Sequence, residues 1–235
     1  MKRNISLKAV IFDLDGTLLD TLEDLADAGN RVLADSGLPV HPVAAYRYFV
    51  GDGLTALIRR ILPEGMRNDE EVRRKSMAFR EIYAKNWNAK TRLYPGVDTL
   101  LNGLQEKGLP MNVLSNKPHD FTEICVREFL GGWTFAHVLG NREGLAKKPD
   151  PAGALEIAGK LGLAPSEIIY VGDTATDMKT AAAAGMYAVG ALWGFRTAEE
   201  LEVSGAAFLA QRPEDVLELP GKGCAPFSGA ADQKR

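Results

Sequence analysis

Short apolar runs alternate with amphipathic segments along most of this chain. The clearest apolar runs, typical of strands buried on both faces, cover residues 9–12, 111–114, 168–171 and 187–190. Weaker runs lie at 136–139 and 207–209, and apolar residues at helical spacing mark 97–104, 120–130, 151–161 and 176–184. Strands that alternate with helices predict an α/β fold: a parallel sheet with helices on both faces.

A block without strands interrupts this alternation. Thr21, followed by Asp24, has the pattern of a capping box at the start of its first helix. Further helices are expected at 43–48, 54–61 and 69–87, and no strand is expected between Leu18 and Arg92. We therefore predict an α/β core formed by 1–17 and 94–219, a small inserted helical cap at 18–93, and a disordered tail at 220–235.

Composition narrows the class of protein. Hydrophobic residues make up 46% of the chain and charged residues 25%, as in ordinary globular proteins. The 28 basic and 31 acidic residues give a net charge of −3, which argues against a nucleic-acid partner. No apolar run approaches the roughly 20 residues of a membrane span. Two cysteines do not form a disulfide framework, so we expect a reducing, cytoplasmic location. Nothing in the sequence predicts the oligomeric state.

Unusual polar residues follow the predicted strands, where ligands bind in open parallel sheets. There are four such segments: Asp13-Leu14-Asp15-Gly16-Thr17, Ser115-Asn116-Lys117, Lys147-Lys148-Pro149-Asp150 and Gly172-Asp173-Thr174-Ala175-Thr176-Asp177. Because the carboxyl ends of parallel strands meet at one edge of a sheet, these segments are expected to form one site.

The first segment has the residues that phosphoryl transfer needs. Asp13 leaves a rigid strand, and a carboxylate is a competent nucleophile toward phosphorus. Asp15 lies two residues further on, on the same side of an extended chain, so it can protonate a leaving oxygen and later activate water. Gly16 permits a tight turn, and Thr17 offers a hydroxyl and an N–H near the substrate.

Cations must balance a phosphate ester among carboxylates. Asp173, with Asp177 one helical turn further, supplies the oxygen ligands that Mg²⁺ prefers. Ser115 can hydrogen-bond a phosphoryl oxygen, and Lys148 can offset its charge. Plain structural roles also exist: Ser115 and Asn116 can cap the following helix, and Asp173 suits a helix N-terminus.

The four segments resemble the motifs of the haloacid dehalogenase (HAD) superfamily. Asp-Leu-Asp-Gly-Thr after an apolar strand is similar to its first motif. The family's second motif is similar to Ser115-Asn116-Lys117-Pro118, and its third is similar to Lys148-Pro149-Asp150-Pro151. Its fourth motif is similar to Gly172-Asp173-Thr174-Ala175-Thr176-Asp177-Met178. They occur in the family's order, and the resemblance covers about residues 8–200.

The resemblance implies that the α/β fold is a Rossmann-like parallel sheet core with a small inserted helical cap, and it implies a role for each motif residue. Asp13 is expected to be the nucleophile and Asp15 the general acid and base. Mg²⁺ is expected to bind Asp13, the backbone carbonyl of Asp15, and Asp173, with Asp177 in support. The expected phosphate-binding residues are Thr17, Ser115, Asn116 and Lys148. The implied reaction is hydrolysis of a small phosphorylated metabolite.

The predicted cap resembles that of the phosphoglycolate phosphatase branch, which makes phosphoglycolate the first candidate substrate. The loop Gly51-Asp52-Gly53 falls where that branch has a cap loop facing the substrate. Asp52 is unexpected there, because an acid is a poor partner for an anion. Arg47, Arg59 and Arg60 are expected to be surface residues, with the alternative that one of them binds a substrate anion.

Other functions use similar residues. A dehalogenase needs neither a metal nor Asp15, so these residues argue against one. A sugar phosphomutase needs the same four motifs, and the sequence does not exclude it. A non-enzymatic phosphate-binding module, such as a receiver domain, has related chemistry, but its acid pair and its acceptor come in a different order.

Overall fold

The structure is a computed structural model that describes residues 7–221. The predicted tail at 220–235 lies outside the described residues from position 222 onward, and the last described element is a 3-10 helix, η4 (Pro213–Gly221). Among the described helices, none combines the length and the apolar character needed to cross a membrane.

A six-stranded sheet forms the centre of the fold, in the order β5-β4-β1-β6-β7-β8. Every neighbouring pair of these strands is parallel, which confirms the α/β prediction. The strands are β1 (Ala9–Phe12), β4 (Met111–Pro118), β5 (Phe135–Asn141), β6 (Ile168–Gly172), β7 (Tyr187–Ala191) and β8 (Phe208–Ala210).

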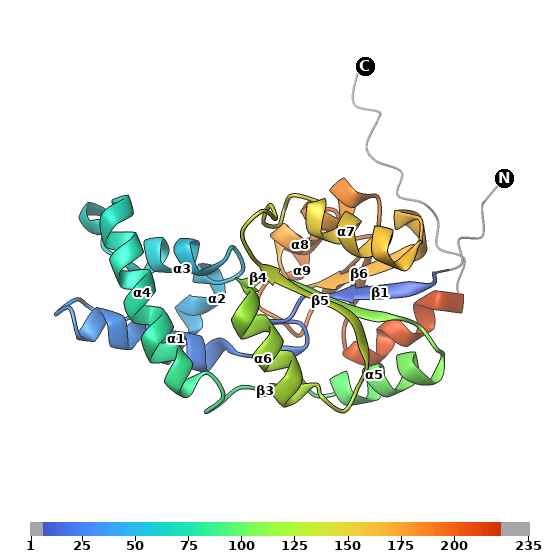
Figure 1. The fold of residues 1–235 in the computed structure, drawn as a ribbon, viewed down its shortest axis with the longest axis horizontal. Helices are drawn as coiled ribbons and strands as arrows, with labels where there is room; N and C mark the ends of the chain where they lie inside the picture. The colour runs from blue at the N-terminus through green and yellow to red at the C-terminus, as the bar shows by residue number, and fades with distance from the viewer. Residues whose placement is uncertain (1–6, 222–235) are drawn as a thin grey trace, which may run out of the picture.

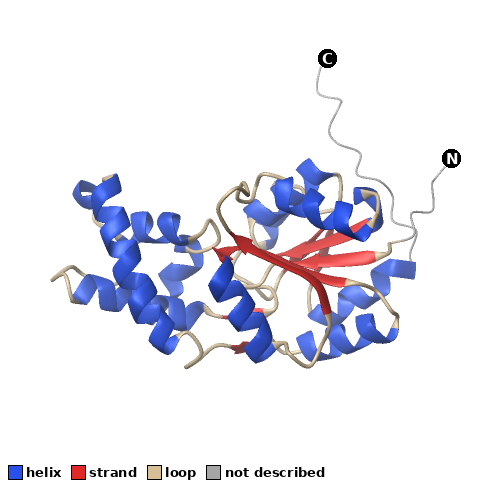
Figure 2. Cartoon of the chain, in the orientation of Figure 1, coloured by secondary structure: helices blue, strands red, loops and turns tan. Residues whose placement is uncertain are grey.

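Helices cover both faces of this sheet (Figure 2). The helices in this part of the chain are α5 (Val97–Glu106), α6 (His119–Phe129), α7 (Ala152–Leu161), η3 (Pro165–Glu167), α8 (Ala175–Ala184) and α9 (Ala198–Val203). One apolar cluster joins the sheet to α5, α6 and η4, and another joins it to α7, α8 and α9. The sheet is therefore the middle of three layers.

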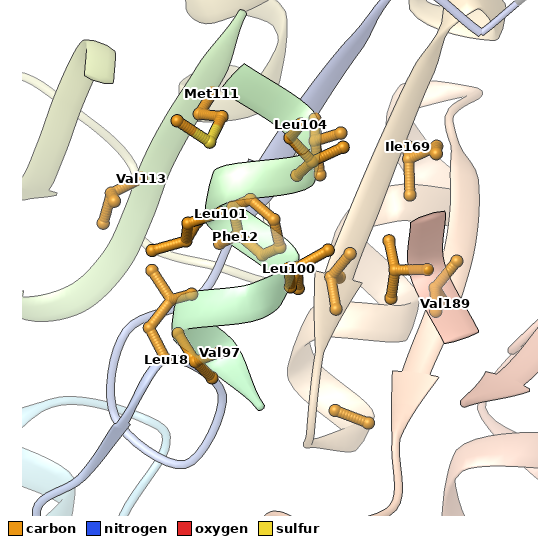
Figure 3. Packing of buried hydrophobic residues seen from close by; sticks show 14 of the residues in the cluster. Phe12, Leu18, Val97, Leu100, Leu101, Leu104, Met111, Val113, Ile169 and Val189 are labelled. Atoms are coloured by element: carbon orange, nitrogen blue, oxygen red, sulfur yellow. The ribbon is translucent and has the colours of Figure 1, made fainter. Parts of the chain in front are cut away.

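Strand β1 holds these layers together because it is buried on both faces. Successive side chains of a strand point to opposite faces, and Val10 and Phe12 belong to the first cluster whereas Ala9 and Ile11 belong to the second. Figure 3 shows Phe12 packed against Leu100 and Leu101 of α5. A continuous apolar run is what such a central parallel strand requires.

Residues 18–93 contain a separate group of helices, which we call the insert. They gather on one side of the molecule, away from most of the sheet (Figure 1). The insert helices are α1 (Leu22–Ala34), η1 (Val43–Ala45), α2 (Tyr46–Phe49), α3 (Leu54–Ile61), η2 (Glu64–Met66) and α4 (Asp69–Asn86). They share an apolar cluster that includes Tyr46, Ile58 and Phe79, and that extends to Phe121 and Phe195 of the core.

Two short strands lie where the insert meets the core, and the prediction of no strand in this region was wrong. β2 (Leu19–Asp20) pairs antiparallel with β3 (Arg92–Leu93). A strand of two residues is too short to show an alternating pattern in the sequence. These two strands are therefore recognised only in the structure, where the two distant segments pair. The two crossings of the chain between insert and core are therefore held side by side.

The predicted capping box at Thr21 was also wrong. Thr21 precedes α1, but its side chain makes no capping hydrogen bond. The Asp24 carboxylate instead accepts hydrogen bonds from the backbone N–H of Lys90 and Thr91 and from the Thr91 hydroxyl, at 2.7–3.0 Å. A segment 66 residues further along the chain thus takes the carboxylate that the local pattern assigned to the helix start.

Candidate active site

Three neighbouring strands bring the motif residues together. β1 lies between β4 and β6 in the sheet. After β1 the sheet is extended on one side by β4 and β5, and then on the other side by β6, β7 and β8. Ligands bind at such a switch point in open α/β sheets. Asp13 directly follows β1 and Asp173 directly follows β6, while Ser115 lies within β4, which runs further than predicted.

Asp13 is buried at this switch point. Its Oδ1 accepts a hydrogen bond from the backbone N–H of Leu14 at 2.7 Å and lies 2.9 Å from Nζ of Lys148. Burial raises the pKa of Asp13 to about 7, against the opposing effect of the Lys148 charge. The Asp13 carboxylate is thus held out of water beside the Lys148 ammonium.

Asp173 is held by the first motif and by the segment after β7. Its Oδ1 accepts a hydrogen bond from the Thr17 hydroxyl at 2.9 Å, and its Oδ2 accepts one from the backbone N–H of Phe195 at 2.8 Å. Burial raises the pKa of Asp173 well above its usual range, and the charges of Asp177 and Asp13 add to this effect. The structure therefore places the Thr17 hydroxyl on Asp173.

Gly16 is required by this packing. Its φ is +92°, a conformation that side-chain-bearing residues rarely adopt. A Cβ built at this position would lie 2.3 Å from Oδ2 of Asp173. Only glycine lets the first motif approach the fourth this closely.

Asp13, Asp173 and Asp177 form one cluster in which a carboxylate oxygen of each lies within 4.8 Å of the others. No other group of three potential ligands of this kind occurs within residues 7–221. All three acids are buried, and the ammonium of Lys148 faces two of them. Buried carboxylates without full compensation favour a cation, and hard oxygen donors suit Mg²⁺. The donor set therefore fits a divalent metal ion.

Asp177 is held by Lys148 and by Thr174. Its Oδ1 accepts a hydrogen bond from Lys148 Nζ at 2.7 Å, and its Oδ2 accepts hydrogen bonds from the N–H and hydroxyl of Thr174 at 3.1 and 2.6 Å. Both oxygens are thus engaged within the protein. Asp177 holds Lys148 and the start of α8 in place.

Lys148 and Asn116 are fixed by each other. Burial lowers the pKa of Lys148, but the charges of Asp13 and Asp177 outweigh it and hold that pKa well above its usual range. The Asn116 amide accepts from the Lys148 N–H at 3.0 Å and donates to the carbonyl oxygens of Lys148 and Gly51, both at 3.1 Å. Asn116 therefore ties the second motif to the third and to the insert.

Asp15 lies apart from the acid cluster and contacts a different cation. Nζ of Lys117 lies 3.0 and 3.2 Å from its two carboxylate oxygens and donates to the Tyr83 hydroxyl at 2.8 Å. From the sequence, Tyr83 is expected only to pack in the core of the cap or at its hinge, and Lys117 has no separate role. The only sign in the sequence that Lys117 belongs to the site was its position in the second motif. Tyr83 has the spacing of an ordinary apolar residue of α4.

A cavity of about 580 Å³, partly open to solvent, lies between the insert and the core. Asp13, Asp15, Ser115 and Asn116 line its core side. Apolar side chains of α1, α3 and α4 line the insert side, among them Leu25, Leu57 and Phe79. The cavity is therefore bounded by the core on one side and by the insert on the other.

Part of the loop predicted to face the substrate lies at the cavity. Gly51 and Gly53 line the cavity, but Asp52 does not. Asp52 accepts a hydrogen bond from the Thr176 hydroxyl at 2.6 Å and pairs with Arg60. Burial raises the pKa of Asp52, but these hydrogen bonds outweigh burial and lower it. The acid that seemed misplaced beside an anion thus joins the insert to α8.

The arginines singled out in the sequence do not line the cavity. Arg47 donates to the Gly194 carbonyl, Arg59 pairs with Asp69, and Arg60 pairs with Asp52. Arg80 of α4 does line it, within 2.5 Å of Asp120 and with its guanidinium 5.3 Å from the Phe121 ring centroid. Its place among several charged residues on α4 did not distinguish it in the sequence.

Known proteins share this architecture. Residues 10–191 match the family described as haloacid dehalogenase-like hydrolase. A phosphoglycolate phosphatase from Pseudomonas putida is 33% identical over 227 residues, which are 94% of this chain and 82% of that protein. Another, from Mannheimia succiniciproducens, is 35% identical over 92% of this chain and 99% of its own length.

Solved structures give the same result. The structure of a predicted phosphoglycolate phosphatase from Haemophilus somnus superposes with a TM-score of 0.83 at 29% identity, over 91% of this chain and 98% of that one. The family match covers all four motifs, and the relatives match nearly end to end. On this evidence, the chain belongs to the haloacid dehalogenase-like hydrolase family.

Proposed function

We propose that this protein hydrolyses a small phosphate monoester through an aspartyl-phosphate on Asp13, with Mg²⁺ as its metal ion. The observation that carries the proposal is the buried Asp13 carboxylate beside Lys148, at the floor of a cavity between core and insert. The relatives named phosphoglycolate phosphatase support a phosphoric monoester hydrolase.

The reaction has two steps. In the first, an Asp13 carboxylate oxygen forms a bond to phosphorus while the bond from phosphorus to the ester oxygen breaks, and Asp15 gives its proton to that oxygen. In the second, Asp15 takes a proton from water, which attacks phosphorus and releases Asp13. Lys148, which lies 2.9 Å from Asp13, and Ser115 would bind the phosphoryl oxygens. Ser115 lines the cavity, and its oxygen accepts a hydrogen bond from the Lys117 N–H at 3.2 Å.

Asp13, Asp173 and the backbone carbonyl of Asp15 would hold Mg²⁺, which supplies positive charge to the transferring phosphoryl group. Asp177 acts mainly by holding Lys148. We also propose that residues 18–93 act as a cap over the site. Such a cap excludes water and limits the substrate to a small metabolite.

Phosphoglycolate is the first candidate substrate. It carries a carboxylate besides its phosphate, and Arg80 places a guanidinium in the wall of the cavity. The partner of Arg80, Asp120, is an exposed side chain, so the guanidinium can exchange it for a substrate carboxylate at low cost.

The test is phosphate release from a panel of small phosphate esters that includes phosphoglycolate, with Mg²⁺ or with EDTA. We expect release with Mg²⁺ and its loss in EDTA, with phosphoglycolate among the best substrates. Isomerisation of a sugar phosphate without phosphate release would indicate a phosphomutase instead. A folded protein that binds phosphate esters and converts none would indicate a binding module.

A further inference from the structure

Lys117 and Tyr83 form a buried polar contact that the reaction described above does not use. Lys117 lies on β4 in the core, and its side chain is 4% exposed. Tyr83 lies on α4 of the insert and is 2% exposed. Both residues line the cavity next to Asp15. The contact therefore crosses from the insert to the core beside the proposed general acid.

The ammonium of Lys117 is held from two sides. It lies 3.0 and 3.2 Å from the oxygens of Asp15, 2.8 Å from the Tyr83 hydroxyl, and 4.8 Å from the centroid of the Tyr83 ring. A lysine has three N–H donors, and these contacts engage them. Burial lowers the pKa of Lys117, but the Asp15 charge and the Tyr83 contact outweigh it and raise that pKa.

Asp15 depends on this cation for its orientation. It follows β1 by three residues, in a segment that turns back toward β2. Among the described residues, the cation that forms an ion pair with the Asp15 carboxylate is Lys117. A carboxylate held through both oxygens has little freedom to rotate, whereas one held by neither can turn toward solvent. The accuracy of proton transfer to the leaving group depends on that orientation.

We propose that Lys117 is a positioning residue for Asp15 and that the Tyr83 hydroxyl holds Lys117 in place from the insert. This inference rests on the proposed function, because it takes Asp15 as the general acid. Through this contact, the insert would contribute to protonation of the leaving group, in addition to covering the site. Lys117 acts through Asp15 and not as a ligand of the substrate anion, since its donors are already engaged.

The experiment compares two esters in the full-length chain with Mg²⁺. An alkyl phosphate has a leaving oxygen that needs a proton, whereas p-nitrophenyl phosphate releases an anion that is stable without one. Single-turnover rates of ester cleavage are measured for Lys117→Met and Tyr83→Phe, each in the wild-type and in the Asp15→Asn background. Tyr83→Phe removes one oxygen only, so it carries the test if Lys117→Met does not fold.

We expect Lys117→Met to slow cleavage of the alkyl phosphate roughly a hundredfold, at the lower end of what general acid catalysis contributes. Tyr83→Phe should slow it roughly two- to tenfold, the effect of one hydrogen bond. With p-nitrophenyl phosphate, both losses should be several-fold smaller. In the Asp15→Asn background, neither variant should slow cleavage further, because both act through Asp15.

Tyr46→Phe is the matched control. Its hydroxyl is also buried in the insert, but it donates to Asn30 at 3.0 Å, and Tyr46 does not line the cavity. The ratio of the two ester rates should be unchanged in this variant.

Two outcomes would overturn the inference. One is an equal loss with both esters, which a merely structural role produces. The other is a further loss of the same size in the Asp15→Asn background, which means that Lys117 contacts the substrate directly. Absence of turnover by the wild-type protein with every ester would instead refute the proposed function, and the inference with it.

Discussion

At the scale of single residues, the site is organised by charge in a place with little water. Asp13, Asp173 and Asp177 are buried together, and Lys148 contacts two of them. Buried like charges resist ionisation, which raises the pKa of both Asp13 and Asp173. Each side chain of the site is therefore adjusted by its neighbours, and its properties depend on the group as a whole.

Asp13→Asn should abolish turnover, by at least about a thousandfold in kcat, because an amide cannot form the phosphoryl bond. The fold should persist, since asparagine keeps the shape of the side chain and relieves repulsion among the acids. Steady-state kinetics and circular dichroism test this, with the exposed Asp98→Asn as control. Appreciable residual turnover would remove Asp13 as the nucleophile.

The raised pKa values predict how stability depends on pH. In EDTA, the pKa of Asp13 is about 7 in the folded protein, against 3.8 ordinarily, so the native state binds more protons between these values. Stability from this group is full below about pH 4 and is lost as the pH rises through 7. Because Mg²⁺ binds the ionised acids, it should raise Tm more at pH 8 than at pH 5.

Thermal unfolding of the wild-type protein and of Asp13→Asn, with EDTA or Mg²⁺ at both pH values, tests this expectation. The variant should show a smaller loss of Tm between pH 5 and pH 8 in EDTA. An equal effect of Mg²⁺ at the two pH values would contradict the assignment of these acids to the metal site.

At the scale of elements, the junction between insert and core depends on one carboxylate. Asp24 of α1 is buried and accepts hydrogen bonds from the segment that precedes β3. β3 in turn pairs with β2 just before α1. The first and last segments of the insert are thereby joined to each other as well as to the core.

Asp24→Ala should lower the free energy of unfolding by about 2–3 kcal/mol, because it leaves buried N–H groups of Lys90 and Thr91 without an acceptor. Urea denaturation measures this loss. Asp27→Ala is the control: Asp27 also pairs with Lys90, at 2.7 Å, but both side chains are about half exposed. Its loss should stay below about 1 kcal/mol. Equal losses would show that Asp24 is not a special anchor.

At the scale of the whole molecule, the insert is held against the core by polar contacts around the cavity. The Asn116 amide donates to the Gly51 carbonyl, Arg196 donates to that of Val50 at 3.0 Å, and the Thr176 hydroxyl donates to Asp52. These contacts exist only while insert and core stay together. Apolar contacts cross the same boundary as well: the ring centroids of Tyr83 in the insert and Phe121 in the core lie 5.1 Å apart.

Thr176→Val should therefore raise KM roughly two- to tenfold, the effect of one lost hydrogen bond on closure. Asp52→Ala should do the same, and the double variant should lose less than the sum in free energy, because the two side chains contact each other. Steady-state kinetics of the three variants measures this coupling, with the exposed Thr99→Val as control. Strict additivity would show that the contact does not contribute to closure.

Much of the fold and of the site's inventory could be predicted from the sequence, because those features are local. Apolar runs predicted β1 and β6 nearly to the residue, since a strand buried on both faces needs a continuous apolar run. The motifs predicted Asp13, Ser115, Lys148 and Asp173 as one group, and the structure brings them to one switch point.

Other features could not be predicted, because they depend on partners distant in sequence. Asp24 was assigned to its own helix, but residues 90 and 91 take its carboxylate. Asp52 seemed unsuited to the site until the structure placed Thr176 and Arg60 against it.

The sequence by itself thus determined the class of fold, the family and the acids of the site, since apolar period and motif spacing are properties of short segments. Only the tertiary structure decided what each polar side chain contacts, and it singled out Lys117, Tyr83 and Arg80. The reason is physical: hydrogen bonds and ion pairs act over a few ångströms in space, whatever the separation along the chain.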